Sequence, residues 1–345
     1  MNPHPRTLDD LRERLADAGA RPVHAQRLVR AWLGGRSFEE PVRPRTPQRG
    51  TTLQEALPAL WEGLDLLVRE VSRHPAPDGS CRRLLRLGSG RTVESVDLPR
   101  AGLCVSTQVG CAVGCRFCRT GEDGLLQQLS PLEILAQVVA ARRERPVRRV
   151  VFMGMGEPAH NLSAVLEAIT ALGEEGGLAH KNLVFSTVGD PAVFRRLAAA
   201  RVRPGLAISL HTLDADRRRE LLPRAPAADP EDLLAAGLEY ADRTTYPLLV
   251  QWTLLEGVND TVDEARALAA RLRGRRAVVN YIPFNSVEGS GFRRPPIARC
   301  VELVRTVKAE GVRGTLRLSA GQDVDAGCGQ LRARIEGARL EGARS

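Results

Sequence analysis

The sequence predicts an α/β fold in which six strand–helix units form an open parallel sheet or partial barrel, preceded by a small helical domain and a β-hairpin. Two observations predict this architecture. From Leu103 onward, short apolar runs alternate with amphipathic helical patterns, which is typical of βαβ units. Before residue 103, apolar residues recur with the spacing of a helix as far as residue 67. Residues 82–98 then show the alternation typical of a hairpin. We divide the chain into an N-terminal helical domain (1–75), a hairpin linker (76–100), the barrel (101–330) and a basic C-terminal tail (331–345).

The helical domain is expected to contain three helices. Thr7 can cap the first helix, which ends near Gly19, and the glycine pair after Leu33 ends the second. A stretch rich in proline and arginine, residues 41–50, leads to a third helix over residues 53–67. The hairpin covers residues 82–98 and turns at a Gly-Ser-Gly sequence.

The barrel is expected to alternate strands with helices along its length. The expected strands cover residues 103–107, 147–153, 182–187, 206–211, 247–255, 277–283 and 315–318. The expected helices cover residues 131–143, 163–172, 191–199, 230–241, 262–272 and 297–310. Ser130 and Glu133 form a capping box around Pro131 at the start of the first of these helices. Barrel sites collect at the C-terminal ends of the strands, and the unusual residues of this sequence fall there.

Composition narrows the class of protein without deciding its function. Lys and Arg number 50 against 41 Asp and Glu, a net charge of +9 that suits a polyanion such as RNA. An arginine-rich composition imposed by a GC-rich genome explains the charge equally well. We expect a cytoplasmic protein without a membrane span, because no apolar run approaches about 18 residues and the N-terminus lacks a secretory apolar centre. The odd count of seven cysteines argues against a secreted disulfide framework.

Three cysteines in eight residues, Cys111, Cys115 and Cys118, carry the sharpest chemical signal. Four-iron, four-sulfur clusters normally have four cysteine ligands, so three leave one iron open. An open iron can chelate the amino and carboxylate groups of S-adenosylmethionine and pass an electron to its sulfonium. The alternative is a zinc site, but zinc ligands usually come in paired Cys-x2-Cys steps with a fourth ligand, and none lies at such a spacing. The loop therefore predicts one [4Fe-4S] cluster.

The Cys-x3-Cys-x2-Cys spacing is that of the radical S-adenosylmethionine (SAM) superfamily, and LCVSTQVGCAVGCRFCRTG resembles the RlmN/Cfr family of RNA adenine methyltransferases. The likeness runs from RPVHAQRLVRAWL to DAGCGQL, with MGMGEPAHN, FSTVGD, AISLH, GVND and NYIPFN in the same order. The resemblance implies an open βα6 radical SAM barrel, two SAM molecules per turnover and a one-electron donor such as a flavodoxin system. We expect a monomer.

The resemblance also implies a set of SAM-binding residues at the strand ends. They are Gly156, Glu157, Ser186, Ser209, Leu210, His211 and Asn285. From the residues alone, glycines after a strand let the backbone approach a ligand, and a glutamate there can accept from the methionine ammonium. Each residue also has an ordinary structural explanation: Gly156 suits a turn at a strand end, and His211 suits a histidine packed at a strand end.

Two further cysteines and one glutamate complete the site that the resemblance implies. Cys328 takes a methyl group from one SAM, and a radical made from a second SAM activates this methyl for addition to adenine. Cys104 then helps to remove the ring proton and resolves the protein–RNA adduct by forming a transient disulfide with Cys328. Glu94 matches the position of the family's general base. Taken alone, each cysteine is a buried free thiol and Glu94 is an exposed residue of an alternating strand.

The expected reaction is methylation of carbon 2 of an adenosine in 23S rRNA, with tRNA as a further substrate. Carbon 8, or another RNA acted on by a divergent paralogue, is the alternative, because the segment before Cys328 is less basic than is usual in the family. The N-terminal arginines could bind phosphates. These are Arg12, Arg14, Arg21, Arg27 and Arg30. Two rivals stay open: a radical SAM enzyme with a non-RNA substrate, and a non-catalytic RNA-binding protein with a structural cluster.

Overall fold

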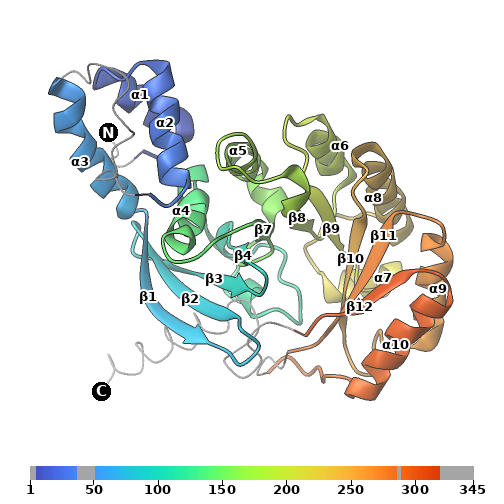
Figure 1. The fold of residues 1–345 in the computed structure, drawn as a ribbon. Coiled ribbons are helices and arrows are strands. Elements are labelled where there is room, and N and C mark those ends of the chain that lie inside the picture. The colour runs from blue at the N-terminus through green and yellow to red at the C-terminus, as the bar shows by residue number, and fades with distance from the viewer. Residues whose placement is uncertain (1–4, 37–50, 286–288, 319–345) are drawn as a thin grey trace, which may run out of the picture.

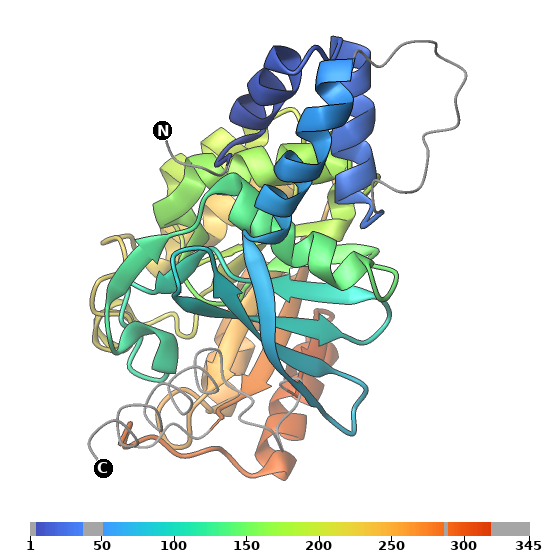
Figure 2. The same ribbon diagram turned by 90° about the vertical axis from the view of Figure 1, so that its left-hand side faces the viewer.

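The structure, a computed structural model, describes residues 5–36, 51–285 and 289–318 (Figures 1 and 2). The predicted loop 41–50, Cys328 and the predicted tail lie outside the described residues. At the N-terminal end, α1 (Leu8–Asp17), α2 (Pro22–Leu33) and α3 (Thr51–Asp65) form the helical unit. Thr7 caps α1, because its side chain accepts a hydrogen bond from the backbone N–H of Asp10. The three predicted helices are therefore present, and the unit packs beside α4 (Pro131–Arg142).

The main sheet begins earlier than predicted. β1 (Val68–Pro75) lies within the residues assigned to the helical domain, and it pairs antiparallel with β2 (Cys81–Leu87). The predicted hairpin is confirmed as β2 and β3 (Thr92–Leu98), but β3 also pairs with β4 (Gly102–Val105), so the hairpin is the edge of the barrel sheet rather than a separate linker. β1 escaped prediction because it is an edge strand with charged, exposed residues instead of an apolar alternation.

Ten strands form one open sheet in the order β1-β2-β3-β4-β7-β8-β9-β10-β11-β12, and all pairs from β4 to β12 are parallel. The remaining parallel strands are β7 (Arg149–Phe152), β8 (Leu183–Thr187), β9 (Gly205–Ser209), β10 (Leu248–Leu254), β11 (Ala277–Pro283) and β12 (Arg313–Leu316). The helices between them are α5 (Leu162–Glu174), α6 (Pro191–Ala199), α7 (Ala215–Leu221), α8 (Pro230–Thr244), α9 (Val262–Leu272) and α10 (Ile297–Ala309). The predicted α/β fold with an open barrel is confirmed.

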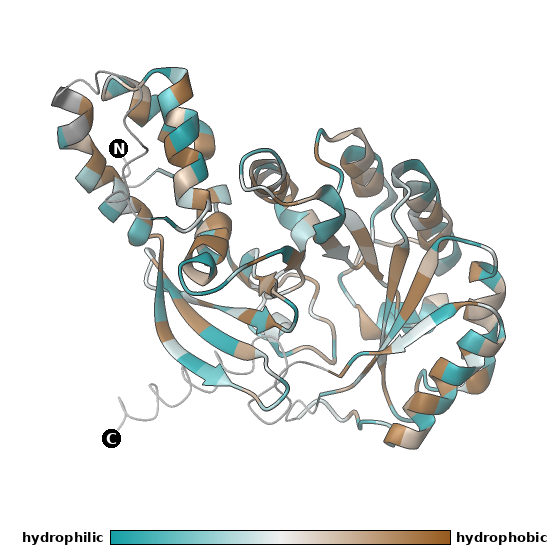
Figure 3. Ribbon diagram, in the orientation of Figure 1, coloured by the Kyte–Doolittle hydropathy of each residue, from teal (hydrophilic) through white to brown (hydrophobic). Residues whose placement is uncertain are grey.

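The two faces of the sheet differ in what covers them. The outer face and the helices share one large apolar core, and Figure 3 shows the largely hydrophobic strands beside helices of mixed character. The inner face carries a separate small cluster of Val96, Cys104, Val151, Val184 and Ala207. Because side chains alternate along a strand, these inner residues point into the hollow of the barrel.

A two-stranded ribbon stands at the C-terminal end of β4. It consists of β5 (Gln108–Gly110) and β6 (Leu125–Gln128), and the cysteine loop connects the two strands through the short 3-10 helix η1 (Arg119–Gly121). No sequence pattern separated this ribbon from the strand before it. The ribbon places the cysteine loop at the rim where the parallel strands end.

Candidate active site

Glycines fix the shape of the cysteine loop. Gly110 has a φ of +76°, and a Cβ added there would lie 2.0 Å from the backbone oxygen of Gly124. A Cβ on Gly121 would lie 2.7 Å from the Cα of Gly114. Both neighbours are backbone atoms that cannot give way, so this close packing requires glycine. The backbone N–H of Cys111 donates to the Gly124 oxygen over 2.8 Å, which closes the loop at its base.

The three thiols of the loop share one environment. Burial raises the pKa of Cys111, Cys115 and Cys118, and for Cys115 the negative charges of the other two thiolates and of Glu157 raise the pKa further. This mutual effect shows that the thiols face a common space. Among the described residues, no three His, Cys, Asp or Glu side chains converge closely enough for a single metal ion. The arrangement fits a cluster, in which each thiolate binds a different iron, better than one tetrahedral zinc ion.

Helix α7 covers one side of the loop. The backbone oxygen of Leu221 accepts from the Arg116 N–H over 3.0 Å, and that of Val113 accepts from the Arg224 N–H over 3.3 Å. Leu221 and Leu222 pack with Cys111 and Val113 in an apolar cluster. The apolar cluster therefore shields the thiols from water on this side.

The Gly-Met-Gly-Glu-Pro segment after β7 is anchored to the end of β4. Gly154 N–H donates to the Val105 oxygen over 3.0 Å, and Met155 N–H donates to Ser106 Oγ over 2.9 Å. A Cβ on Gly154 would lie 2.7 Å from the Val105 oxygen, and one on Gly156, where φ is +99°, would lie 2.5 Å from Gln108 Cβ. The chain's own packing therefore already requires both glycines, whatever ligand approaches the opposite side.

Glu157 joins two strand ends. Its carboxylate accepts from the Ala159 N–H over 3.0 Å and from the Val188 N–H over 2.9 Å, so it ties the segment after β7 to the end of β8. Burial raises the pKa of Glu157, and these hydrogen bonds act in the opposite direction. Two carboxylate oxygens have room for further donors, and the binding of a methionine ammonium stays a prediction.

The other predicted SAM-binding residues lie along the same rim. Ser186 is buried on β8, Ser209 ends β9, and Asn285 follows β11 by two residues. Leu210 is buried, and its N–H donates to the Gln251 oxygen over 3.1 Å. The strand ends thus bring these predicted residues to one edge of the sheet.

His211 packs directly on the cysteine loop. Its ring meets the ring of Phe117 edge-on, with the centroids 4.9 Å apart, and its Nδ1 accepts from the Thr253 N–H over 2.9 Å. His211 has a φ of +65°, a conformation that costs energy for a residue with a side chain. Burial, and secondarily the charge of Arg218, lowers the pKa of His211 to about 3, so its ring is neutral.

Gln251 is a further candidate site residue that no sequence pattern indicated. It lies on β10 in register with Ser209 on β9 and Asn280 on β11, and it is 2% exposed. Neither its amide nitrogen nor its amide oxygen has a hydrogen-bond partner among the described residues. A buried amide without partners costs about 1–3 kcal/mol, so this residue fits a site that a polar ligand such as SAM completes.

Glu94 is buried, not exposed as its strand pattern suggested. It is 2% exposed and its carboxylate pairs with the guanidinium of Arg82 over 2.7 Å. The alternation was misleading because both faces of β3 are covered. The Glu94 backbone oxygen accepts from Ser106 Oγ, whose oxygen in turn accepts from Met155 N–H, so Glu94 is linked to the rim.

Cys104 lies on the inner face next to this ion pair. Burial raises its pKa to about 11, and the charges of Arg317, Arg82 and Glu94 also act on it. The structure therefore brings together Glu94 and Cys104, which the resemblance had placed in one site. Cys104 is a free thiol here, and its predicted partner Cys328 lies outside the described residues.

The N-terminal arginines divide into two groups. Arg12 pairs with Glu175 and Asp9, and Arg14 pairs with Asp10. The other three are exposed on or beside α2. They are Arg21, Arg27 and Arg30. Exposed arginines grouped on one helix suit contacts to phosphate. No helix of the described residues is long and apolar enough to cross a membrane.

Comparisons with known proteins agree with this geometry. The sequence profile of the Radical SAM superfamily matches residues 105–269. The chain is 57% identical over 331 residues to a probable RNA methyltransferase of Pseudomonas paraeruginosa, covering 95% of this chain and 96% of the relative. A probable RNA methyltransferase of Thiobacillus denitrificans is 58% identical, covering 95% and 90%. The crystal structure of a radical SAM methyltransferase from Sphaerobacter thermophilus superimposes with a TM-score of 0.81 at 33% identity, covering 94% and 97%.

Proposed function

Because the chain belongs to the radical SAM methyltransferase family, we propose that it methylates carbon 2 of an adenosine in 23S rRNA, and in tRNA as a further substrate. RNA is the substrate named for its curated relatives. The observation that carries the proposal is the placement of Cys104 and Glu94 on the inner face of the barrel, beside the rim that bears the cysteine loop. A site that merely cleaved SAM would have no need of a thiol and a carboxylate there.

The residues divide into those that generate the radical and those that handle the methyl group. Cys111, Cys115 and Cys118 would hold a four-iron cluster, which when bound would supply the one-electron reduction that cleaves SAM. Gly156, Glu157 and Ser186 hold SAM at the rim, together with Ser209, Leu210, His211 and Asn285. The apolar packing around the cysteine loop excludes water from the radical.

Cys328 carries the methyl group that is transferred, and Cys104 releases the product. At neutral pH the Cys104 thiol is protonated, because its pKa is about 11. It must therefore lose its proton before it attacks the sulfur of Cys328. Glu94, whose carboxylate pairs with the Arg82 guanidinium over 2.7 Å, serves as the general base of the reaction. Before this attack the adduct loses the ring proton of the methylated carbon, with the help of Cys104. The products are a methylated adenosine and a Cys104–Cys328 disulfide, which a thiol reductant reopens.

The target adenosine has to leave its base stack to reach this chamber. Enzymes that act on ring atoms extrude the base from its helix, at a cost of a few kcal/mol. The exposed arginines of α2 provide phosphate contacts that hold the RNA while this occurs, so its binding weakens with salt. We propose a monomer in the cytoplasm with a flavodoxin-like electron donor.

The first experiment separates radical chemistry from mere RNA binding. The protein is reconstituted anaerobically with iron and sulfide and incubated with SAM, dithionite and ribosomal RNA. We expect 5′-deoxyadenosine together with 2-methyladenosine in a nucleoside digest, and neither product from a Cys115→Ala control. Detection of 8-methyladenosine would move the proposed site of methylation from carbon 2 to carbon 8. Formation of 5′-deoxyadenosine without any methylated nucleoside would indicate a substrate other than RNA. No deoxyadenosine would contradict the radical mechanism.

A further inference from the structure

Helix α7 carries three consecutive arginines with different environments. Arg217 pairs with Glu264 over 2.8 Å, and Arg219, which is 70% exposed, pairs with Asp216 on the surface. Arg218 lies between them in the sequence but is 4% exposed. The helix therefore directs Arg218 into the protein, while Arg217 is half-buried and Arg219 is exposed.

The Arg218 guanidinium reaches the ends of two barrel strands. It donates to the backbone oxygens of Ser209 over 3.3 Å, of Leu210 over 3.2 Å and of Val188. Ser209 ends β9, and Val188 follows β8. Since the last turn of α7 also contacts the cysteine loop through Leu221, Arg218 lies between this loop and the rim.

Among the described residues, this buried cation forms no ion pair with a carboxylate. None of its hydrogen bonds or ion pairs within residues 5–36, 51–285 and 289–318 involves an acidic side chain. Burial lowers the pKa of Arg218 to about 10, while the charges of Cys115 and Glu157 act in the opposite direction. Carbonyl dipoles solvate a guanidinium but do not neutralise it. A buried charge without a counter-ion is costly, so the site calls for an anionic occupant.

We propose that Arg218 is the buried counter-charge of the iron–sulfur cluster and holds its reduction potential high enough for the electron to enter. The inference rests on the proposed cluster at Cys111, Cys115 and Cys118. An oxidised four-iron cubane with three thiolates carries one net negative charge, and the same cubane carries two after accepting one electron. A fixed cation stabilises the doubly charged form more, which raises the potential. Arg218 is thus a positioning residue that acts through charge: no bond changes and no proton moves at it.

The test is a redox titration of the reconstituted holoprotein without SAM, followed by the electron paramagnetic resonance signal of the reduced cluster. Dithionite supplies the electron. In Arg218→Gln, which keeps hydrogen-bonding groups but removes the charge, we expect at least a tenfold lower ratio of reduced to oxidised cluster at a fixed potential. For a one-electron couple this equals a midpoint shift of about 59 mV to more negative potential. Arg219→Gln removes the neighbouring exposed charge and should leave the midpoint unchanged.

The titration omits SAM because the SAM carboxylate is the other anion that could approach Arg218. Without SAM, a shifted midpoint reports the effect of Arg218 on the cluster alone. An Arg218→Gln midpoint equal to that of the wild type, at equal iron content, would overturn the inference while leaving the proposed function intact. A midpoint that shifts only after SAM is added would also overturn it. Wild-type protein that binds no cluster would overturn both proposals.

A second variant covers the case in which Arg218→Gln fails to fold. Arg218→Lys keeps the charge but cannot reach three carbonyl oxygens at once. We expect it to retain a midpoint close to that of the wild type even where its stability falls. A markedly more negative midpoint in Arg218→Lys would show that the hydrogen bonds, and not the charge, set the potential, and would contradict the inference.

Discussion

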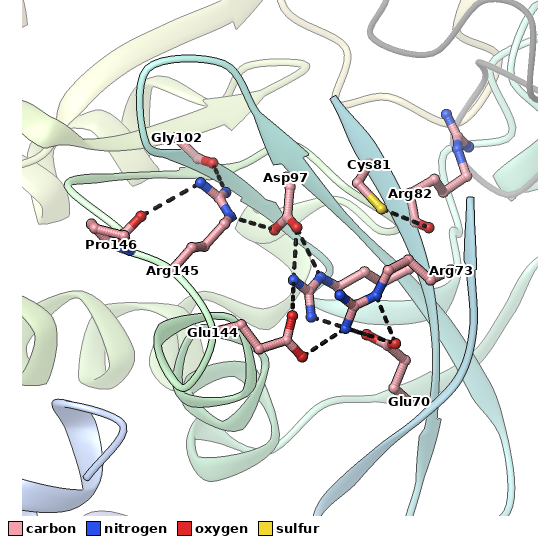
Figure 4. A network of polar contacts seen from close by, with 10 residues as sticks. Glu70, Arg73, Cys81, Arg82, Asp97, Gly102, Glu144, Arg145 and Pro146 are labelled. Atoms are coloured by element: carbon pink, nitrogen blue, oxygen red, sulfur yellow. Dashed lines mark hydrogen bonds and ion pairs between the residues drawn. The ribbon is translucent and has the colours of Figure 1, made fainter. Parts of the chain in front are cut away.

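Arg82 and Arg83 are neighbours on β2, yet they serve opposite faces of the sheet. Both side chains are nearly inaccessible, at 2% and 3% exposure, and both pair with carboxylates of β3. Arg83 lies on the outer face, where it pairs with Asp97, Glu70 and Glu144. Figure 4 shows these three carboxylates converging on one network. Arg82 turns away from that network and pairs with Glu94 on the inner face.

The surroundings of the two pairs explain the difference. The outer network joins β1, β2, β3 and the segment after α4, because Glu70 and Glu144 also bind Arg73. The inner pair lies beside the Cys104 thiol. A buried ion pair is often no more stabilising than apolar side chains of similar volume. We therefore interpret the outer pair as part of the scaffold and the inner pair as part of the chemistry.

The largest expected effect is a difference in methylation rate between variants of the two β3 carboxylates, Glu94 and Asp97. Glu94→Gln should lower the rate of adenosine methylation by roughly 10²–10⁴-fold, the usual contribution of a general base. Asp97→Asn, the matched change on the outer face, should leave that rate within a few-fold of the wild type once folded protein is compared. Product is measured by nucleoside mass spectrometry at equal iron content. Equal loss in both variants would erase the distinction between the faces.

Stability should show the reverse order. Arg83→Met leaves the buried Asp97 carboxylate without its main partner, so we expect the free energy of unfolding to fall by about 3–5 kcal/mol. The paired change Arg82→Met with Glu94→Leu removes both charges together and should stay within about 1 kcal/mol of the wild type. Denaturant titration of the metal-free proteins measures both values. A double variant as unstable as Arg83→Met would assign the inner pair to the scaffold as well.

Alkaline pH should lower the free energy of unfolding through the Cys104 thiol on the inner face. The Cys104 pKa is raised to about 11 from an ordinary value near 9, so the protonated thiol stabilises the fold below pH 9. This contribution is lost as the pH rises through 11, and the loss approaches about 3 kcal/mol. Cys104→Ala should therefore lose less stability than the wild type between pH 8 and pH 11. Parallel plots of unfolding free energy against pH for the wild type and Cys104→Ala would contradict the raised pKa of Cys104.

Acid should lower the free energy of unfolding through Glu144 on the outer face, and this is the smallest of the expected effects. Hydrogen bonding to Arg73, and then to Arg83, lowers the pKa of Glu144 below its usual 4.5. Its contribution is present above that value and is lost as the pH falls through the lowered pKa. The stability difference between the wild type and Glu144→Gln should shrink from pH 6 to pH 3. Since Glu144 is 41% exposed, salt should weaken the effect, and a difference that grew with acid would contradict the assignment.

Sequence reasoning succeeded where local signals are strong. The capping box at Ser130 and the Thr7 cap marked helix starts, and α6 and α9 have the predicted bounds. The apolar runs marked the central strands because parallel strands are buried on both faces. Charged β1 and the short ribbon that holds the cysteine loop carry no such signal.

The candidate site was predictable in part for the same reason. The spacing of three cysteines and the resemblance identified the rim residues. Which face of β3 is covered, and hence the burial of Glu94, depends on strand pairing across the hairpin. Arg218 and Gln251 were missed because nothing in their local sequence distinguishes them from surface residues. Their burial follows from contacts with strands far away in the chain.

The assignment of the inner face to the reaction is tested most directly by trapping the covalent adduct. By the proposed mechanism, Cys104→Ala, expressed with an intact cluster and incubated with SAM, dithionite and ribosomal RNA, should fail to resolve the link between Cys328 and adenosine. Mass spectrometry after protease and nuclease digestion should find the Cys328 peptide joined to an adenosine in this variant and not in Cys104→Ala with Cys328→Ala. A Cys104→Ala protein that releases methylated adenosine as fast as the wild type, without any adduct, would contradict the account.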